Sequence, residues 1–105
     1  MEEPLQIEVP MERIEAFCGK WKVRRMWLFG SVLRGDFGPE SDVDVMVEFA
    51  PEARWSLLDL VGAEQELGAV LGRSVDLIER QCVEQSTNRI RRRHILENAR
   101  TLYVA

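Results

Sequence analysis

The sequence predicts an α/β (α+β) fold, in which a small mixed β-sheet carries helices packed mainly on one face. Short apolar or alternating segments typical of strands lie near residues 26–29, 42–48 and 74–78. Longer segments with apolar residues at helical spacing lie before, between and after them. Because 105 residues suit one domain, we expect a single domain over residues 1–105.

The chain begins with a segment that we expect to be a poorly ordered arm or a short edge strand, residues 1–9. Pro10 is suited to begin a helix, since the N–H that it lacks is not needed in the first helical turn. Residues 11–18 have apolar side chains at helical spacing, and Gly19 is a natural point for that helix to end.

The stretch that follows the first strand is predicted to bind phosphate. The strand ends in Gly30-Ser31 and opens a short helical segment, so backbone N–H groups are left free there. Gly30 would let a ligand approach the backbone, and Ser31 could cap the helix and offer its hydroxyl to a phosphate oxygen. A simple turn with an N-cap is the alternative. A helix end contributes only about 0.3–1 kcal/mol toward an anion, so a triphosphate would also need metal ions.

Two carboxylates open the second strand. Asp42 and Asp44 point to one face, because residues two apart in a strand share a face, and Val43, Val45 and Val47 line the other. At about 5 Å and an effective dielectric of about 20, the two charges repel by roughly 3 kcal/mol. A divalent cation would reverse the sign of this interaction, and magnesium prefers a few carboxylates plus substrate phosphates. For an isolated Asp-x-Asp pair, a solvated strand face is the alternative.

The longest helix is predicted from its two ends. Ser56 is suited to be its N-cap, with Asp59 in a capping box, and Gly72 follows its last residue near position 71. We expect Glu64 and Glu66 to face water. The predicted core stripe of this helix consists of Leu57, Leu58, Val61, Leu67, Val70 and Leu71.

The last part of the chain holds a third strand at 74–78, a helix at 88–99 and a short strand at 101–104. The basic run at 89–93 is read as a solvated helix face that could also attract an acidic partner. His94 is read as a surface or packing residue without a catalytic role. The apolar residues of the helix that we expect to point inward are Ile90, Ile95 and Leu96.

Composition excludes several classes of function. A net charge of −4 and a pI of about 5.0 argue against general nucleic-acid binding. No apolar run approaches the roughly 20 residues of a membrane span. The acidic N-terminus lacks the apolar core of a signal peptide, so we expect a cytoplasmic protein. Cys18 and Cys82 are predicted to be small buried or half-buried residues, in neither a disulfide nor a metal site.

Gly30-Ser31 followed after ten residues by Asp42-x-Asp44 resembles the signature of the DNA polymerase β-like nucleotidyltransferase superfamily. The fuller pattern, GSxxRG and then SDxDxxV, is similar to that of the minimal nucleotidyltransferases of prokaryotes, and so is the ending ILENARTLY. The resemblance extends over roughly residues 12–104 and implies a polymerase β-like nucleotidyltransferase core.

The resemblance also implies a set of site residues. The family has a third carboxylate on a later strand, and Asp76 stands where that residue should be. Arg34 would lie near the phosphates, although a surface arginine paired with Asp36 or Glu40 is the alternative. The implied catalytic residues, which would bind two Mg²⁺ ions, are Asp42, Asp44 and Asp76. The implied nucleotide-binding residues are Gly30, Ser31, Arg34 and Ser41.

The reaction that the resemblance implies is metal-dependent transfer of a nucleoside monophosphate, AMP from ATP, to a hydroxyl group. Because the sequence offers no second domain for an acceptor, we expect another protein in that role. Minimal nucleotidyltransferases are commonly antitoxins that adenylylate a tyrosine of a HEPN-domain toxin, which predicts a type VII-like antitoxin in a hetero-oligomer. The alternatives are a non-catalytic module that neutralises its partner by occlusion, and a nucleotidyltransferase that acts on RNA or a small molecule.

Overall fold

A computed structural model describes residues 9–33, 38 and 41–105 of the chain. The predicted N-terminal arm and the prediction for Arg34 lie outside this part. The described helices are α1 (Met11–Trp21), the 3₁₀ turn η1 (Gly30–Leu33), α2 (Leu57–Leu71), α3 (Arg80–Glu84) and α4 (Arg89–Asn98). The described strands are β1 (Val23–Phe29), β2 (Val43–Phe49), β3 (Val75–Glu79) and β4 (Arg100–Val104).

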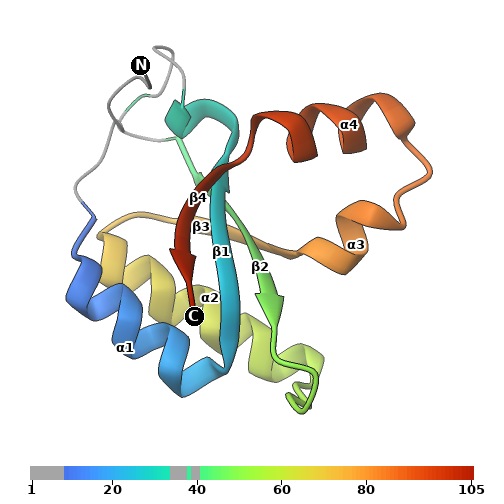
Figure 1. Ribbon diagram of the computed structural model, residues 1–105. Coiled ribbons are helices and arrows are strands. Elements are labelled where there is room, and N and C mark those ends of the chain that lie inside the picture. The colour runs from blue at the N-terminus through green and yellow to red at the C-terminus, as the bar shows by residue number, and fades with distance from the viewer. Residues whose placement is uncertain (1–8, 34–37, 39–40) are drawn as a thin grey trace.

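The strands of the described chain form one four-stranded sheet in the order β3-β2-β1-β4 (Figure 1). β1 pairs antiparallel with β2 and with β4, whereas β2 and β3 are parallel. The parallel pair is connected through α2, as parallel strands require a long crossover. The predicted small mixed sheet is therefore confirmed, including the short last strand.

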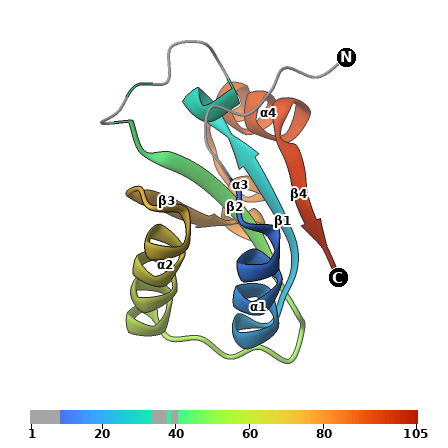
Figure 2. The same cartoon turned by 90° about the vertical axis from the view of Figure 1, so that its left-hand side faces the viewer.

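The main core lies between one face of the sheet and the two long helices, α1 and α2, which lie side by side (Figure 2). The alternating valines of β2, at 43, 45 and 47, are fully buried against these helices, as predicted. Cys18 of α1 is also buried there, and burial, with a smaller contribution from Glu15, raises the pKa of its thiol to about 12. Cys18 therefore stays protonated, whereas Cys82 is exposed, contrary to its prediction.

The opposite face of the sheet carries a smaller core. Trp27, Phe29 and Met46 of the sheet are buried there against Val83 of α3 and Ile95 of α4. The face of the sheet opposite the two long helices is therefore partly covered, over the central strands β1 and β2, by α3 and α4. This arrangement matters for function, because Asp44 belongs to this second face by strand alternation.

The predicted end of helix α1 at Gly19 is wrong. The helix continues to Trp21, and its C-cap residue, Lys22, is in the left-handed conformation with φ of 57°. Its last turn is held by tertiary contacts. The Trp21 indole N–H donates to Glu66 Oε2 at 2.7 Å, and its ring meets that of Trp55 with centroids 5.0 Å apart. These contacts outweigh the local preference of glycine for a helix end.

The two ends of α2 are as predicted, whereas its buried face is not. Ser56 and Asp59 form a reciprocal capping box, and Gly72 ends the helix with φ of 68°. The buried residues are Ala63, Leu67 and Leu71, while Leu57, Leu58 and Val61 are 79%, 83% and 44% exposed. At about 100° per residue, Leu58 lies about 180° around the helix from the centre of the buried stripe.

The prediction that Glu64 and Glu66 face water is wrong. Glu64 Oε2 accepts a hydrogen bond of 2.9 Å from the backbone N–H of Leu77, on the outer edge of β3. Glu66 accepts from Trp21 and forms an ion pair of 2.6 Å with Lys20. The two glutamates therefore join α2 to β3 and to α1, respectively.

Helix α4 begins after Asn88, whose side chain accepts from the backbone N–H of Arg91 at 3.0 Å. Ile95 is buried as predicted, but Ile90 is 85% exposed, because five residues correspond to about 140° around a helix. In the described residues, none of the helices is both long enough and apolar enough to span a bilayer.

Candidate functional site

Two of the predicted carboxylates lie next to each other on adjacent strands. Asp44 is the second residue of β2, and in the parallel ladder its register partner on β3 is Asp76. Neighbouring strands lie about 4.8 Å apart, and register partners point to the same face. Asp42 immediately precedes β2 and is exposed, like Asp76, while Asp44 is half-buried. The adjacency of β2 and β3 that the resemblance implied is therefore present.

Carboxylate oxygens in this arrangement suit a magnesium ion that is bound together with a substrate. In the described part of the chain, no group of three or more His, Cys, Asp and Glu side chains is gathered closely enough to hold a metal ion by itself, so the structure brings Asp44 and Asp76 together but does not gather Asp42 with them into a metal site. Magnesium commonly takes one or two carboxylates and completes its coordination with water and phosphate oxygens. The register pair Asp44 and Asp76, with Asp42 two residues before Asp44 in the chain, fits that mode better than a closed protein cage.

Gly30 lies against Asp44. Its φ is +77°, which disfavours any residue with a side chain, and a Cβ at this position would lie 2.1 Å from Asp44 Oδ2. Phe29, the preceding residue, is the register partner of Asp44 on β1. The glycine predicted to let a ligand approach therefore first makes room for the carboxylate itself. The side chain of Ser31 and the whole of Arg34 lie outside the described part of the chain.

Ser41 closes the turn that leads into the carboxylate strand. Its hydroxyl accepts a hydrogen bond of 3.0 Å from the Gly38 N–H, and its own N–H donates to the Gly38 carbonyl at 3.1 Å. Arg73, just before β3, donates from Nη2 to the carbonyl oxygens of Gly38 and Ser41. Sequence reasoning missed Arg73; the only signal was a cation close to Asp76 in the chain.

For the nucleotide transfer that the family resemblance implies, we expect Arg73→Ala to lower kcat/KM by about tenfold, because the turn before Asp42 loses two hydrogen bonds from a charged donor. Steady-state kinetics at a temperature where the variant is fully folded would measure this effect. Arg54→Ala is a suitable control, since Arg54 also donates to two carbonyls, at the far end of β2. An equal loss in both variants would contradict a specific role for Arg73.

A cavity of about 200 Å³ lies beside Asp44 and is covered by α4. Its described lining residues from the sheet side are Phe29, Gly30 and Asp44, and those from α4 are Arg91, His94, Ile95 and Asn98. From the sequence, His94 was read as a surface or packing residue, and α4 was not assigned to the site. The signal was the spacing i, i+3, i+4, i+7, which aligns these four residues on one helix face.

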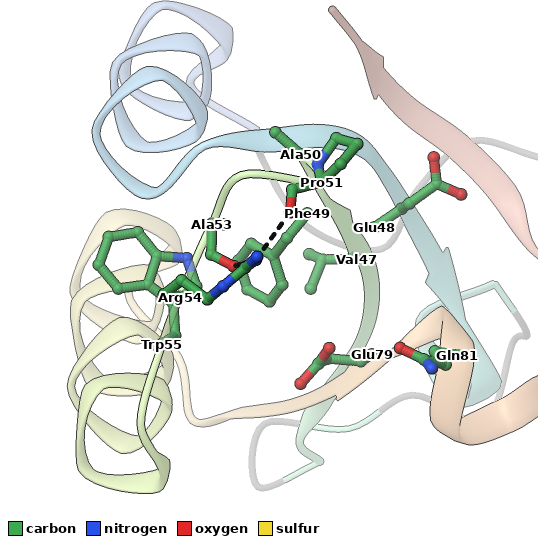
Figure 3. Close-up of a pocket in the computed structure, with 10 residues that line it drawn as sticks. All are labelled: Val47, Glu48, Phe49, Ala50, Pro51, Ala53, Arg54, Trp55, Glu79 and Gln81. Carbon is green, nitrogen blue, oxygen red and sulfur yellow. Dashed lines mark hydrogen bonds between the residues drawn. The ribbon is translucent and has the colours of Figure 1, made fainter.

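A larger cavity, of about 370 Å³, lies at the other end of β2 (Figure 3). Among its lining residues are Glu48 and Glu79 at the ends of β2 and β3. Glu48 accepts two hydrogen bonds from Arg25, which holds the pKa of this carboxyl below its usual value. Four residues of strand, about 13 Å, separate Glu48 from Asp44. This cavity is therefore distinct from the carboxylate site.

Known proteins are similar to this chain in sequence and in fold. A family model described as "Nucleotidyltransferase domain" matches residues 11–101. The relative "Protein adenylyltransferase MntA" of Thermococcus cleftensis is 42% identical over 59 residues, which are 56% of this chain and 58% of that protein. The matched stretches span 58% to 64% of the lengths of the curated relatives.

Two solved structures resemble the chain closely in fold. A protein described as a "putative minimal nucleotidyltransferase" is 30% identical, with a TM-score of 0.65 and 87% of each chain covered. A toxin–antitoxin structure with AMP-PNP is 19% identical, with a TM-score of 0.69, and covers 92% of this chain and 75% of that one. The family match spans most of the chain and includes Gly30, Asp42, Asp44 and Asp76. The chain belongs to the nucleotidyltransferase domain family.

Proposed function

We propose that this chain is a protein adenylyltransferase that moves AMP from ATP to a hydroxyl group of a partner protein. The observation that carries the proposal is the register pair Asp44 and Asp76, which lies beside a glycine whose backbone admits no side chain. Paired carboxylates in a strand register repel each other unless a cation lies between them. Such a pair next to a phosphate-binding turn is suited to a metal-bound nucleotide.

In this proposal Asp42, Asp44 and Asp76 hold two Mg²⁺ ions. Gly30, Ser31, Arg34 and Ser41 contribute to binding the nucleotide. Bound magnesium would neutralise phosphate charge and align the reacting groups. The acceptor oxygen forms a bond to the α-phosphorus as the bond from that phosphorus to the bridging oxygen breaks, and pyrophosphate leaves. Asp76 helps to take the proton of the acceptor hydroxyl.

For the acceptor, we propose a tyrosine of a HEPN-domain toxin, with the chain acting as a cytoplasmic antitoxin. The relative from T. cleftensis is named a protein adenylyltransferase, and similar folds occur in toxin–antitoxin structures, one of them with a tri-AMPylated HEPN toxin. The net charge of −4 also makes RNA a poor acceptor.

The test is to incubate the protein with labelled ATP, Mg²⁺ and a HEPN toxin encoded beside it. We expect label on the toxin, a mass increase of one or more AMP units on a tyrosine, and loss of both when EDTA removes the metal. The toxin should stay inactive after the antitoxin is removed.

Other outcomes would support other functions. A toxin that is unmodified and regains activity on separation would support a non-catalytic antitoxin that acts by occlusion. Label that appears on RNA, with binding that weakens steeply as salt rises, would support an RNA acceptor.

A further inference from the structure

One face of α4 is turned toward the carboxylate site by the packing of this helix on the second core. Ile95 is buried with Trp27 and Phe29 in the second core, so it sets the rotation of the helix. Arg91, one turn earlier, and Asn98, about one turn later, then lie along the same face and line the cavity beside Asp44. The Asn98 amide donates to the carbonyl of His94 at 2.8 Å, so part of its hydrogen-bonding capacity is used within the helix.

Arg91 differs from the other arginines in the second half of the basic run. Arg92 donates to the carbonyls of Glu84 and Ser86, and Arg93 forms an ion pair of 2.9 Å with Glu97. Within the described residues, the structure gives the guanidinium of Arg91 neither a hydrogen bond nor an ion pair, and the residue is exposed. A cation that lines a cavity and keeps its donors available is suited to an anionic ligand.

The order of the strands indicates which part of the proposed nucleotide substrate would lie in the cavity beside Asp44. Asp44 on β2 has Asp76 on one side, on β3, and the end of β1 with Gly30 on the other side. The cavity is lined by Phe29, Gly30 and Asp44, and Asp76 is not among its described lining residues. The cavity therefore lies on the side of Asp44 that faces the phosphate-binding turn, away from the carboxylate proposed to meet the acceptor.

We infer that Arg91 binds the terminal phosphates of the nucleoside triphosphate, so that α4 forms a wall of the nucleotide site. This inference rests on the proposed function. A volume of about 200 Å³ is below the roughly 300–1,000 Å³ of a pocket that encloses a whole small molecule, so it suits one end of a nucleotide. Arg91 would offer two parallel N–H donors to phosphate oxygens that Gly30 approaches from the opposite wall. As pyrophosphate leaves, the same donors would stabilise its charge.

Binding measurements on the intact protein test this inference without requiring catalysis. The probes are a non-hydrolysable ATP analogue with Mg²⁺, tripolyphosphate with Mg²⁺, and AMP, each titrated calorimetrically. We expect Arg91→Ala to weaken binding of the ATP analogue and of tripolyphosphate by about tenfold or more, and to leave AMP affinity unchanged. Arg91→Lys should keep part of the affinity, since it retains the charge but not the two-pronged donor.

Arg89→Ala is the matched control. Arg89 is the first residue of the same helix and is exposed, and its replacement by alanine removes the same charge. It is not among the described residues that line the cavity. The affinity of the Arg89→Ala variant for the ATP analogue and for tripolyphosphate should stay within about twofold of that of the parent, as expected for a long-range charge effect screened by salt. Arg91→Gln, which keeps a long side chain of good helix propensity, repeats the test if the alanine variant folds poorly.

The outcomes separate this inference from the proposed function. If the parent binds the ATP analogue and both Arg91→Ala and Arg91→Gln bind it equally well, Arg91 is not a phosphate ligand and the proposed function stands. If the parent binds none of the three probes, both proposals are wrong. An equal loss for AMP and for tripolyphosphate would also overturn the inference, because it assigns Arg91 to the terminal phosphates alone.

Discussion

Asp44→Asn is expected to reduce nucleotide transfer by about a thousandfold or more while the protein stays folded. Asp44 lies between two features of the site. Asp76 is its register partner on the neighbouring strand, and Gly30 lies against it on the other side. The amide keeps the shape of the side chain but is a poor magnesium ligand. The substitution also relieves the repulsion of Asp76, so we expect the free energy of unfolding without metal to change by less than about 1 kcal/mol.

The two effects should be measured on one sample, by thermal unfolding without metal and by single-turnover transfer with ATP and Mg²⁺. Glu52→Gln is the control, since it removes one negative charge from an exposed turn at the far end of β2. Its transfer rate should equal that of the parent. An Asp44→Asn protein that is clearly destabilised and transfers at a near-normal rate would exclude Asp44 from the site.

Gly30→Ala is expected to lower transfer by about a hundredfold and to destabilise the fold by about 1–3 kcal/mol. The φ of +77° disfavours alanine, and the new methyl group would lie 2.1 Å from Asp44 Oδ2. Since the backbone around Gly30 is held by β1, the Asp44 carboxylate must move. Its displacement from the position beside Asp76 is the reason for the larger effect on transfer.

The control for Gly30→Ala is Gly19→Ala. Gly19 is in α1, and a Cβ there meets no atom within 4 Å, so alanine should stabilise the protein by about 0.5–1 kcal/mol without altering transfer. Transfer should be measured per folded molecule, at a temperature where both variants are native. If Gly30→Ala lowers stability but each folded molecule transfers normally, then Gly30 has only a structural role and does not position Asp44.

The sequence determined those features that depend on neighbours along the chain. Asp42 and Asp44 are two residues apart, so alternation alone directs the valine at 43 to the core and the carboxylates away from it. The capping box of Ser56 and Asp59 and the helix end at Gly72 are confirmed, because each depends on hydrogen bonds within three or four residues. The signature of the family is likewise local.

Which segments meet depends on packing between parts of the chain that are far apart in sequence. The parallel register of Asp44 with Asp76 depends on α2 crossing between two strands some 30 residues apart, and composition does not determine it. Arg73 reaches the turn at Gly38, and Trp21 overrides the helix end predicted at Gly19, through contacts between distant residues. The same holds for α4, whose face is selected by the burial of Ile95 against the sheet. Periodicity along the helix puts Arg91 on the same face as Ile95, but only this packing brings that face to the cavity beside Asp44.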